Sequence, residues 1–217
     1  MTKTANKNRR AQPKEVRKEQ LIQATIKCIA NHGLSGVTMG LVTKEAGLSM
    51  GIANLHFESK EKLLLETLQS VTSEYATGQA EILDSEDFDT VAAKIEALLA
   101  FDFSANVGDK NKLAVWFGFL GEAKSRPTYQ RICSRQDSLS EQKMTALFQL
   151  ALDEAGDTNS DANLIAAGYI ALVDGLWLNS LVDPRRLPWK KSLRAARHYL
   201  ASALPGHIKP PSEKGDT

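Results

Sequence analysis

Cysteine is scarce in this sequence of 217 residues, and the patterns of metal and catalytic sites are missing. Cys28 and Cys133 are the only cysteines and neither belongs to a CxxC pair, so we expect buried thiols, with a disulfide as the alternative. The four histidines show no metal-ligand spacing, and neither a Gly-rich phosphate loop nor a nucleophile elbow occurs. The sequence therefore predicts no metal, no cofactor and no catalytic residues.

Long hydrophobic runs are also missing. The longest nearly apolar run, Leu164 to Val173, is too short to span a bilayer, and no apolar segment follows the basic N-terminus. We therefore expect a cytoplasmic protein without a membrane partner. Because 42% of its residues are apolar, the chain can still bury a sizeable core.

The net charge of +1 is distributed unevenly along the chain. Residues 1–62 contain eleven basic and five acidic residues, a net charge of +6, whereas residues 63–217 contain sixteen basic and twenty-one acidic residues, a net charge of −5. A positive N-terminal region favours contact with nucleic-acid phosphates. The alternative is a basic arm that is merely solvated.

The basic region contains a helix-turn-helix pattern between Thr38 and Phe57. Thr38 is suited to cap a helix that begins at about residue 39. In Ala46-Gly47-Leu48-Ser49, the glycine suits a left-handed helix end and Ser49 suits a new N-cap, so a second helix should run from Met50 to about Leu55. In such motifs the second helix enters the major groove. An ordinary helical hairpin inside a core is the alternative.

Apolar residues recur with helical spacing along most of the chain, and no stretch alternates as a strand does. Residues 1–13 have almost no apolar content and should be a disordered basic arm, while residues 205–217 should be a disordered tail. The sequence thus predicts an all-α fold of about nine helices. The expected helices cover about residues 14–32, 39–46, 50–55, 60–79, 90–103, 113–123, 128–154, 162–181 and 189–204.

Residues 14–64 resemble the TetR family of bacterial repressors. The resemblance is carried by Gly33, Thr38, Ala46-Gly47-Leu48-Ser49, Gly51, His56-Phe57 and Ser59-Lys60-Glu61-Lys62-Leu63-Leu64. It implies a homodimer in which residues 14–59 form a three-helix DNA-binding domain and residues 60–204 form a helical ligand-binding and dimerisation domain. It also implies a double-stranded, palindromic DNA operator from which a small-molecule inducer releases the repressor.

The resemblance also implies which residues touch DNA. Asn54 stands where the family usually has a tyrosine that contacts a phosphate. Met50, Ile52 and Leu55 have no hydrogen-bonding side chain, so they can read thymine methyl groups and groove shape. The full set of expected DNA-binding residues is Thr38, Ser49, Met50, Ile52, Asn54, Leu55, His56 and Lys60.

A looser resemblance covers residues 113–182. Ala114 to Phe119, Arg126-Pro127 and Val173 to Leu178 are similar to the choline-responsive repressors of glycine-betaine synthesis, which often have a second tryptophan where Leu120 stands here. It implies a cavity for choline or a related quaternary ammonium compound, with aromatic faces and a carboxylate around the cation. The expected ligand-binding residues are Trp116, Phe119, Glu122, Tyr129, Asp174 and Trp177.

Two alternatives to this pocket stay open. The aromatic residues could form plain core, and the ligand could be another small apolar or cationic molecule. For the whole protein, the hypothesis is a ligand-responsive DNA-binding regulator that is not an enzyme. The alternative from another class is a helical small-molecule carrier or enzyme without a DNA-regulatory role, which would need a nucleophile or metal cluster that the sequence does not show.

Overall fold

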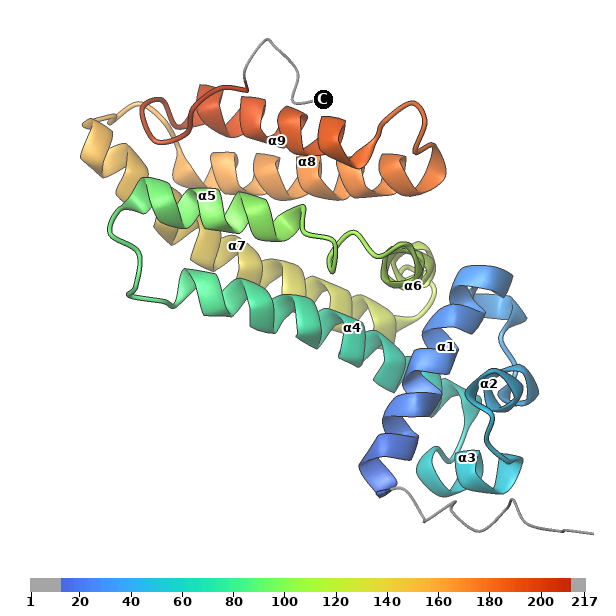
Figure 1. The fold of residues 1–217 in the computed structure, drawn as a ribbon. Helices are drawn as coiled ribbons and strands as arrows, with labels where there is room; N and C mark the ends of the chain where they lie inside the picture. Colours follow the sequence, from blue (N-terminus) through green and yellow to red (C-terminus); the bar gives the residue numbers. More distant parts are fainter. Residues whose placement is uncertain (1–12, 212–217) are drawn as a thin grey trace, which may run out of the picture. The chain divides into compact units, whose positions relative to one another are not determined.

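The computed structural model describes residues 13–211, with the side chains at positions 136 and 137 left out. Within this part the chain forms nine α-helices and no strand, so the predicted all-α fold is confirmed (Figure 1). The chain divides into two compact units between Ser70 and Val71. The predicted basic arm, except Pro13, and the end of the predicted tail lie outside the described residues.

The first unit contains α1 (Lys14–Gly36), α2 (Met39–Ala46), α3 (Met50–His56) and the beginning of α4 (Lys60–Leu83). The regular part of α1 is interrupted at Gly33, whose φ of 69° lies in the left-handed region that favours glycine. The sequence predicts a helix end at this glycine. One further turn then follows before the chain reaches α2.

The turn between α2 and α3 has the predicted caps. Thr38 Oγ1 accepts a hydrogen bond from the Leu41 amide at 3.2 Å, and Ser49 Oγ accepts one from the Ile52 amide at 3.4 Å. Between these caps, Gly47 has a φ of 64° and ends α2 in the left-handed conformation. Local sequence therefore accounts for the orientation of α3 relative to α2.

The first unit reaches beyond α3 and includes the first turns of α4. The reason is side-chain packing: Leu63 and Leu68 are fully buried, and Lys18 of α1 pairs with Glu66 of α4 at 2.7 Å.

The second unit contains the remainder of α4 together with α5 (Val91–Asp102), α6 (Lys110–Glu122), α7 (Pro127–Ala155), α8 (Ala162–Val182) and α9 (Trp189–Ala203). Helix α8 packs against α6, α7 and α9, and α5 packs against α7 and α9. Figure 1 shows α8 and α9 running side by side. Helix α8 is therefore the central element of this unit.

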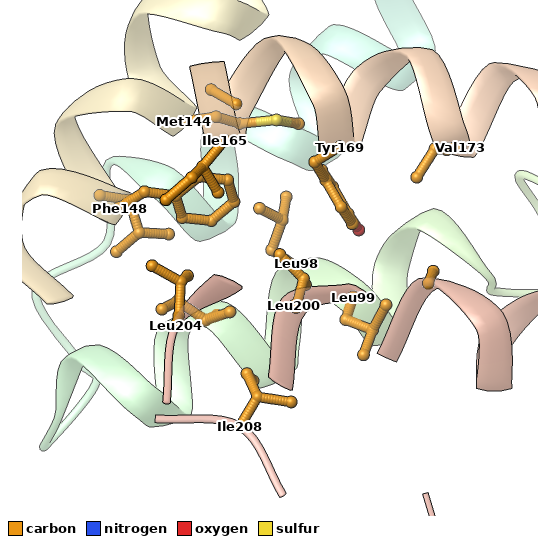
Figure 2. Packing of buried hydrophobic residues seen from close by; sticks show 14 of the residues in the cluster. Leu98, Leu99, Met144, Phe148, Ile165, Tyr169, Val173, Leu200, Leu204 and Ile208 are labelled. Atoms are coloured by element: carbon orange, nitrogen blue, oxygen red, sulfur yellow. The ribbon is translucent and has the colours of Figure 1, made fainter. Parts of the chain in front are cut away.

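The core of the second unit is built from α5, α7, α8 and α9. Figure 2 shows side chains from these helices converging, among them Leu98, Met144, Phe148, Tyr169 and Leu200. Each of these five is at most 1% exposed. Cys28 in the first unit and Cys133 in the second are buried thiols, as predicted.

The C-terminal part of the chain differs from one expectation. The tail was predicted to begin at residue 205, but Ile208 is only 4% exposed because its side chain completes the core beside Leu204 (Figure 2). The apolar run from Leu164 to Val173 is by itself too short to span a bilayer. Among the described residues, α8, which contains this run, is the one helix that could do so by length and composition, with 21 residues and a mean hydropathy of 1.5 over an 18-residue window.

The composition of α8 has a simple structural explanation. Its inner face packs in the core through Ala166, Tyr169 and Val173. The helix also exposes large apolar side chains on its outer face, so few polar residues remain. A core helix with a second apolar face has the same composition as a membrane span.

Candidate functional sites: a reading helix and a cavity

The outer face of α3 exposes apolar and polar side chains to solvent. Met50 is 42% exposed and Leu55 is 71% exposed, and Asn54 is exposed between them. On the opposite side, Ala53 is fully buried and Phe57, directly after the helix, is 1% exposed. Two large apolar side chains of this seven-residue helix therefore face solvent, while its buried side packs through Ala53.

The other predicted DNA-binding residues lie around the same helix. Thr38 and Ser49 are exposed and cap α2 and α3, while Ile52, His56 and Lys60 are partly buried. His56 Nδ1 is buried and makes no hydrogen bond within the described chain. Ser59 Oγ accepts from the Lys62 amide at 3.1 Å, so Lys60 stands in the first turn of the capped helix α4.

The second unit encloses a cavity of about 90 Å³. This volume suits several waters or a small organic molecule. The lining comes from α4, α5, the connection after α5, α6, α7 and α8. Its aromatic residues are Tyr75, Phe101, Trp116, Tyr169 and Trp177. Its charged residues are Glu74, Asp102, Lys112 and Asp174.

Three of the predicted ligand-binding residues line this cavity: Trp116, Asp174 and Trp177. The Trp116 Nε1 atom is buried and has no hydrogen-bond partner within residues 13–211. By contrast, Trp177 Nε1 donates to the Asp102 carbonyl oxygen at 3.0 Å. Trp116 therefore offers an unused donor, whereas Trp177 is already held by the backbone of α5.

The other three predicted residues lie apart from the cavity lining. Phe119 and Tyr129 are fully buried and pack edge to face, with ring centroids 4.7 Å apart. Glu122 Oε2 pairs with Arg126 Nε at 2.7 Å, and the Arg126 guanidinium lies 5.2 Å from the Tyr129 ring centroid. The structure thus brings these residues together in a separate α6–α7 cluster, because Phe119 faces α7 instead of the cavity.

Asp102 was missed by the sequence analysis and lies at the centre of the polar contacts in the cavity. Its side chain is fully buried. The Tyr75 hydroxyl donates to Oδ1 and the Tyr169 hydroxyl donates to Oδ2, both at 2.8 Å. Gln79 Nε2 in turn donates to the Tyr75 oxygen at 2.9 Å, which directs the Tyr75 proton towards Asp102.

Burial raises the pKa of Asp102 from its ordinary value of 3.8 to about 7. The hydrogen bonds from Tyr169 and Tyr75 oppose this rise, and the negative charge of Asp174 adds to it. The same surroundings raise the pKa of the Tyr169 hydroxyl well above its ordinary value, first through burial and then through Asp102. The pKa of Asp102 thus lies close to neutral pH.

A polar cluster occupies one side of the cavity. Lys112 Nζ donates to Glu74 Oε1 at 2.6 Å and to Asn106 Oδ1 at 2.7 Å, and Asn106 Nδ2 donates to Glu74 Oε1 at 2.8 Å. Although burial alone would raise the pKa of Glu74, the hydrogen bonds from Lys112 and Asn106 lower it overall. Lys112 is thus already compensated by a carboxylate.

Two tryptophans fix the chain where α5 ends. Trp177 of α8 donates to the Asp102 carbonyl, and Trp189 of α9 donates to the next carbonyl, that of Phe103, at 2.7 Å. The connection that begins there contributes Asn106 and Val107 to the cavity lining. Hydrogen bonds from α8 and α9 therefore hold the start of this connection in place.

The two units together define a class of protein: helical DNA-binding regulators that have an N-terminal helix-turn-helix and a C-terminal domain with a cavity. Residues 21–67 match the family model described as bacterial regulatory proteins of the tetR family, and residues 91–205 match the C-terminal domain of BetI-type transcriptional repressors. The chain belongs to the TetR family of transcriptional regulators, with a BetI-type C-terminal domain. The predicted resemblance is confirmed.

Relatives with similarity over nearly their whole length support this assignment. The chain is 30% identical to the HTH-type transcriptional regulator BetI of Paraburkholderia xenovorans over 88% of this chain and 95% of that protein. It is 29% identical to BetI of Paraburkholderia phytofirmans, with the same coverage. These relatives are regulators and not enzymes, so the alternative of an enzyme or carrier is not supported.

Solved structures show the same fold. A transcriptional regulator from Pseudomonas aeruginosa PAO1 is 26% identical, has a TM-score of 0.77, and matches 93% of this chain and 98% of its own. A regulator from Saccharomonospora viridis, solved in complex with choline, is 18% identical with a TM-score of 0.74, over 87% of this chain and 96% of its own. At that identity the second match shows the fold alone.

Proposed function

We propose that this regulator is a homodimeric repressor that binds a palindromic operator in the cytoplasm and is released by a small organic cation of the choline type. The observation that carries the ligand class is a fully buried carboxyl group, Asp102, inside a cavity walled by aromatic rings. Aromatic faces attract quaternary ammonium groups, and a carboxylate supplies the counter-charge. The choline complex of the Saccharomonospora viridis neighbour agrees with this class.

The reading face of α3 supports the proposed operator contacts. Met50 and Leu55 present apolar surface that suits thymine methyl groups, and Ile52 extends it in part. Thr38, Ser49, Asn54, His56 and Lys60 supply polar and charged groups for phosphates or base edges. The surplus of basic residues in the N-terminal region supports a salt-dependent affinity for DNA.

The outer face of α8 supports a second copy of the chain as partner. Leu164, Leu178 and Val182 are 71%, 41% and 74% exposed, and the smaller Ala167 and Ala171 are exposed between them at helical spacing. A contiguous apolar stripe of this kind marks an interaction site. Because one stripe can pair with its own copy around a two-fold axis, it suits a symmetric dimer.

The proposed mechanism is a shift between two conformers. Helix α4 is continuous from Lys60, a proposed phosphate contact, to Tyr75 and Gln79, which are linked to Asp102. A dimer must hold its two reading helices about one duplex turn apart, roughly 34–36 Å or a multiple of it. A ligand that favours a different conformer of α4 would disturb this spacing, and DNA would weaken ligand binding by the same factor.

A binding assay with a duplex from upstream of the protein's own gene tests this function. We expect affinity to fall linearly with the logarithm of salt concentration, and choline to weaken the complex. Choline should also raise the melting temperature of the free protein. Trp116→Ala should remove that rise, whereas Phe117→Ala, at the neighbouring aromatic outside the cavity lining, should keep it.

Two outcomes would reject the proposal. Affinity for DNA that does not change with salt would exclude binding through phosphates. A melting temperature that choline, betaine aldehyde and other organic cations leave unchanged would exclude the proposed ligand class.

A further inference from the structure

We infer that Asp102 is the counter-ion of the bound cation and that it gives up a proton when the cation binds, so that the response to the inducer strengthens as pH rises. This inference rests on the proposed function, because it assumes that the cavity takes an organic cation. It assigns the charge recognition to a residue on α5 instead of the predicted Asp174 or Glu122.

Burial of Asp102 without a cationic partner favours a neutral carboxyl group in the ligand-free protein. The hydroxyls of Tyr75 from α4 and Tyr169 from α8 donate to the two carboxyl oxygens, but these donors carry no charge and offset the effect of burial only in part. Among residues 13–211 no Lys, Arg or His pairs with Asp102. Because a buried carboxylate without a cationic partner is costly, the proton is retained to a higher pH.

The charged groups on the surrounding helices do not supply that cation. Helix α4 contributes Glu74 and α6 contributes Lys112, and these two pair with each other at 2.6 Å. From α8, Asp174 adds a second negative charge that further disfavours ionisation of Asp102. The α7 residues of the lining, Ser140 and Met144, are uncharged, and α9 contributes no residue to it.

Asp174 is less suited to be the proton-linked group. It lines the same cavity but is partly exposed, so burial disfavours its charged form less than that of Asp102. Asp102 has no such contact with solvent, because its side chain is fully buried. A cation in the cavity therefore shifts the equilibrium between the neutral and the ionised carboxyl group most strongly at Asp102.

The proton balance of binding follows directly. Burial holds the pKa of Asp102 at about 7, and a positive charge beside the carboxyl group lowers it. The carboxylic acid then loses its proton to solvent and becomes the carboxylate partner of the cation. A neutral molecule of the same shape releases no proton. Selectivity for the cation over its neutral isostere should therefore increase with pH.

Calorimetric titration of choline into the full-length protein tests this inference without any variant. At each pH, buffers with different ionisation enthalpies report the number of protons released. We expect close to one proton at about pH 6 and almost none at about pH 8.5. As pH rises towards 7, the dissociation constant of choline should fall by up to about tenfold per pH unit. The neutral isostere 3,3-dimethylbutan-1-ol should release no proton.

Choline binding without proton release and with a pH-independent dissociation constant would overturn the inference while leaving the proposed function intact. If choline and the other organic cations do not bind at any pH, both the proposed ligand class and this inference are rejected. The two failures are therefore distinguishable.

Variants locate the proton. Asp102→Asn keeps the side-chain shape and should abolish proton release and weaken choline binding at least about tenfold at high pH, while the neutral isostere still binds. Asp174→Asn is the matched control and should still release a proton. If the asparagine variant does not fold, Tyr169→Phe replaces it: removing one hydroxyl donor should move proton release to higher pH. Proton release that Asp102→Asn or Tyr169→Phe leaves unchanged would contradict the assignment.

Discussion

The two units build their sites in opposite ways. The proposed DNA contacts all come from residues 38–60, where caps and a left-handed glycine fix short helices and the functional side chains are exposed or partly buried. The cavity of the second unit collects residues between Val71 and Trp177 from five helices, and its key carboxyl group is fully buried. Local sequence determines the first site, whereas tertiary packing determines the second. Substitutions at the first site should therefore alter function with little effect on stability, whereas substitutions at the second site should alter both.

The largest expected effect contrasts a cavity residue with a reading-face residue. Trp177 is 6% exposed and donates to the Asp102 carbonyl, so Trp177→Ala should lower the free energy of unfolding by about 3–5 kcal/mol. Leu55 is 71% exposed, so Leu55→Ala should change it by less than about 0.5 kcal/mol while weakening operator binding. Urea unfolding and a DNA-binding assay measure the two effects.

A conservative variant serves as the control for this contrast. Trp177→Phe keeps a six-membered aromatic ring but removes the indole donor and part of the buried volume, so its loss of stability should lie between those of Trp177→Ala and Leu55→Ala. If Leu55→Ala unfolds the protein as readily as Trp177→Ala, the reading face has a structural role and the contrast between the units is wrong.

The second effect is a pH dependence of stability that originates in the second unit. The pKa of Asp102 is about 7 in the folded chain and near 3.8 when exposed, so between these values the folded state binds more protons than the unfolded state. The free energy of unfolding should therefore fall as pH rises from about 4 to 7, by up to about 1.4 kcal/mol per pH unit. Urea unfolding over this range measures the slope.

Asp102→Asn isolates this contribution, because every other titrating group stays in place. The difference in stability between the parent protein and the variant should change with pH in the stated direction. A difference that stays constant from pH 4 to 7 would show that Asp102 is ionised throughout.

The smallest expected effect is the loss of stability when equivalent helix caps in the two units are removed. Thr38 Oγ1 accepts from the Leu41 amide at 3.2 Å and Thr90 Oγ1 accepts from the Ala93 amide at 3.1 Å. Replacing either threonine by alanine should cost about 1 kcal/mol, because each leaves a helix amide without its acceptor. Only Thr38→Ala should also weaken DNA binding. Thr38→Ser keeps the hydroxyl and should restore both properties, and equal DNA affinity for the two alanine variants would remove Thr38 from the proposed interface.

Most of the fold could be predicted because its helix ends are determined locally. Gly33, Thr38, Gly47 and Ser49 each act on neighbouring amides or torsions, so their consequences follow from sequence spacing alone. Helix α6 began three residues earlier than expected, because Asp109 accepts from the amides of Asn111 and Lys112. The unit boundary and Ile208 were harder to predict, since both depend on side chains that meet only in the folded chain.

The cavity could be predicted only in part for the same reason. The spacing of Trp116 and Phe119 places them near each other on α6, but it does not show that Phe119 faces Tyr129 on α7. Asp102 stands between Phe101 and Phe103 in an apolar segment, and a lone carboxylate in such a place is a signal for a buried polar site. Its tyrosine partners lie 27 and 67 residues away in the chain, which no local pattern shows.

Helix α8 would constrain how specificity for the proposed inducer can evolve. Tyr169 and Trp177 on its inner face contact the cavity, while Leu178 and Val182 on its outer face form part of the proposed dimer surface. A substitution on α8 that reshapes the cavity can therefore also alter subunit association. Trp116 on α6 offers a less constrained route, because its indole donor is unused and α6 carries no residue of that surface. New ligand specificities should therefore be easier to select at position 116 than at positions 169 or 177.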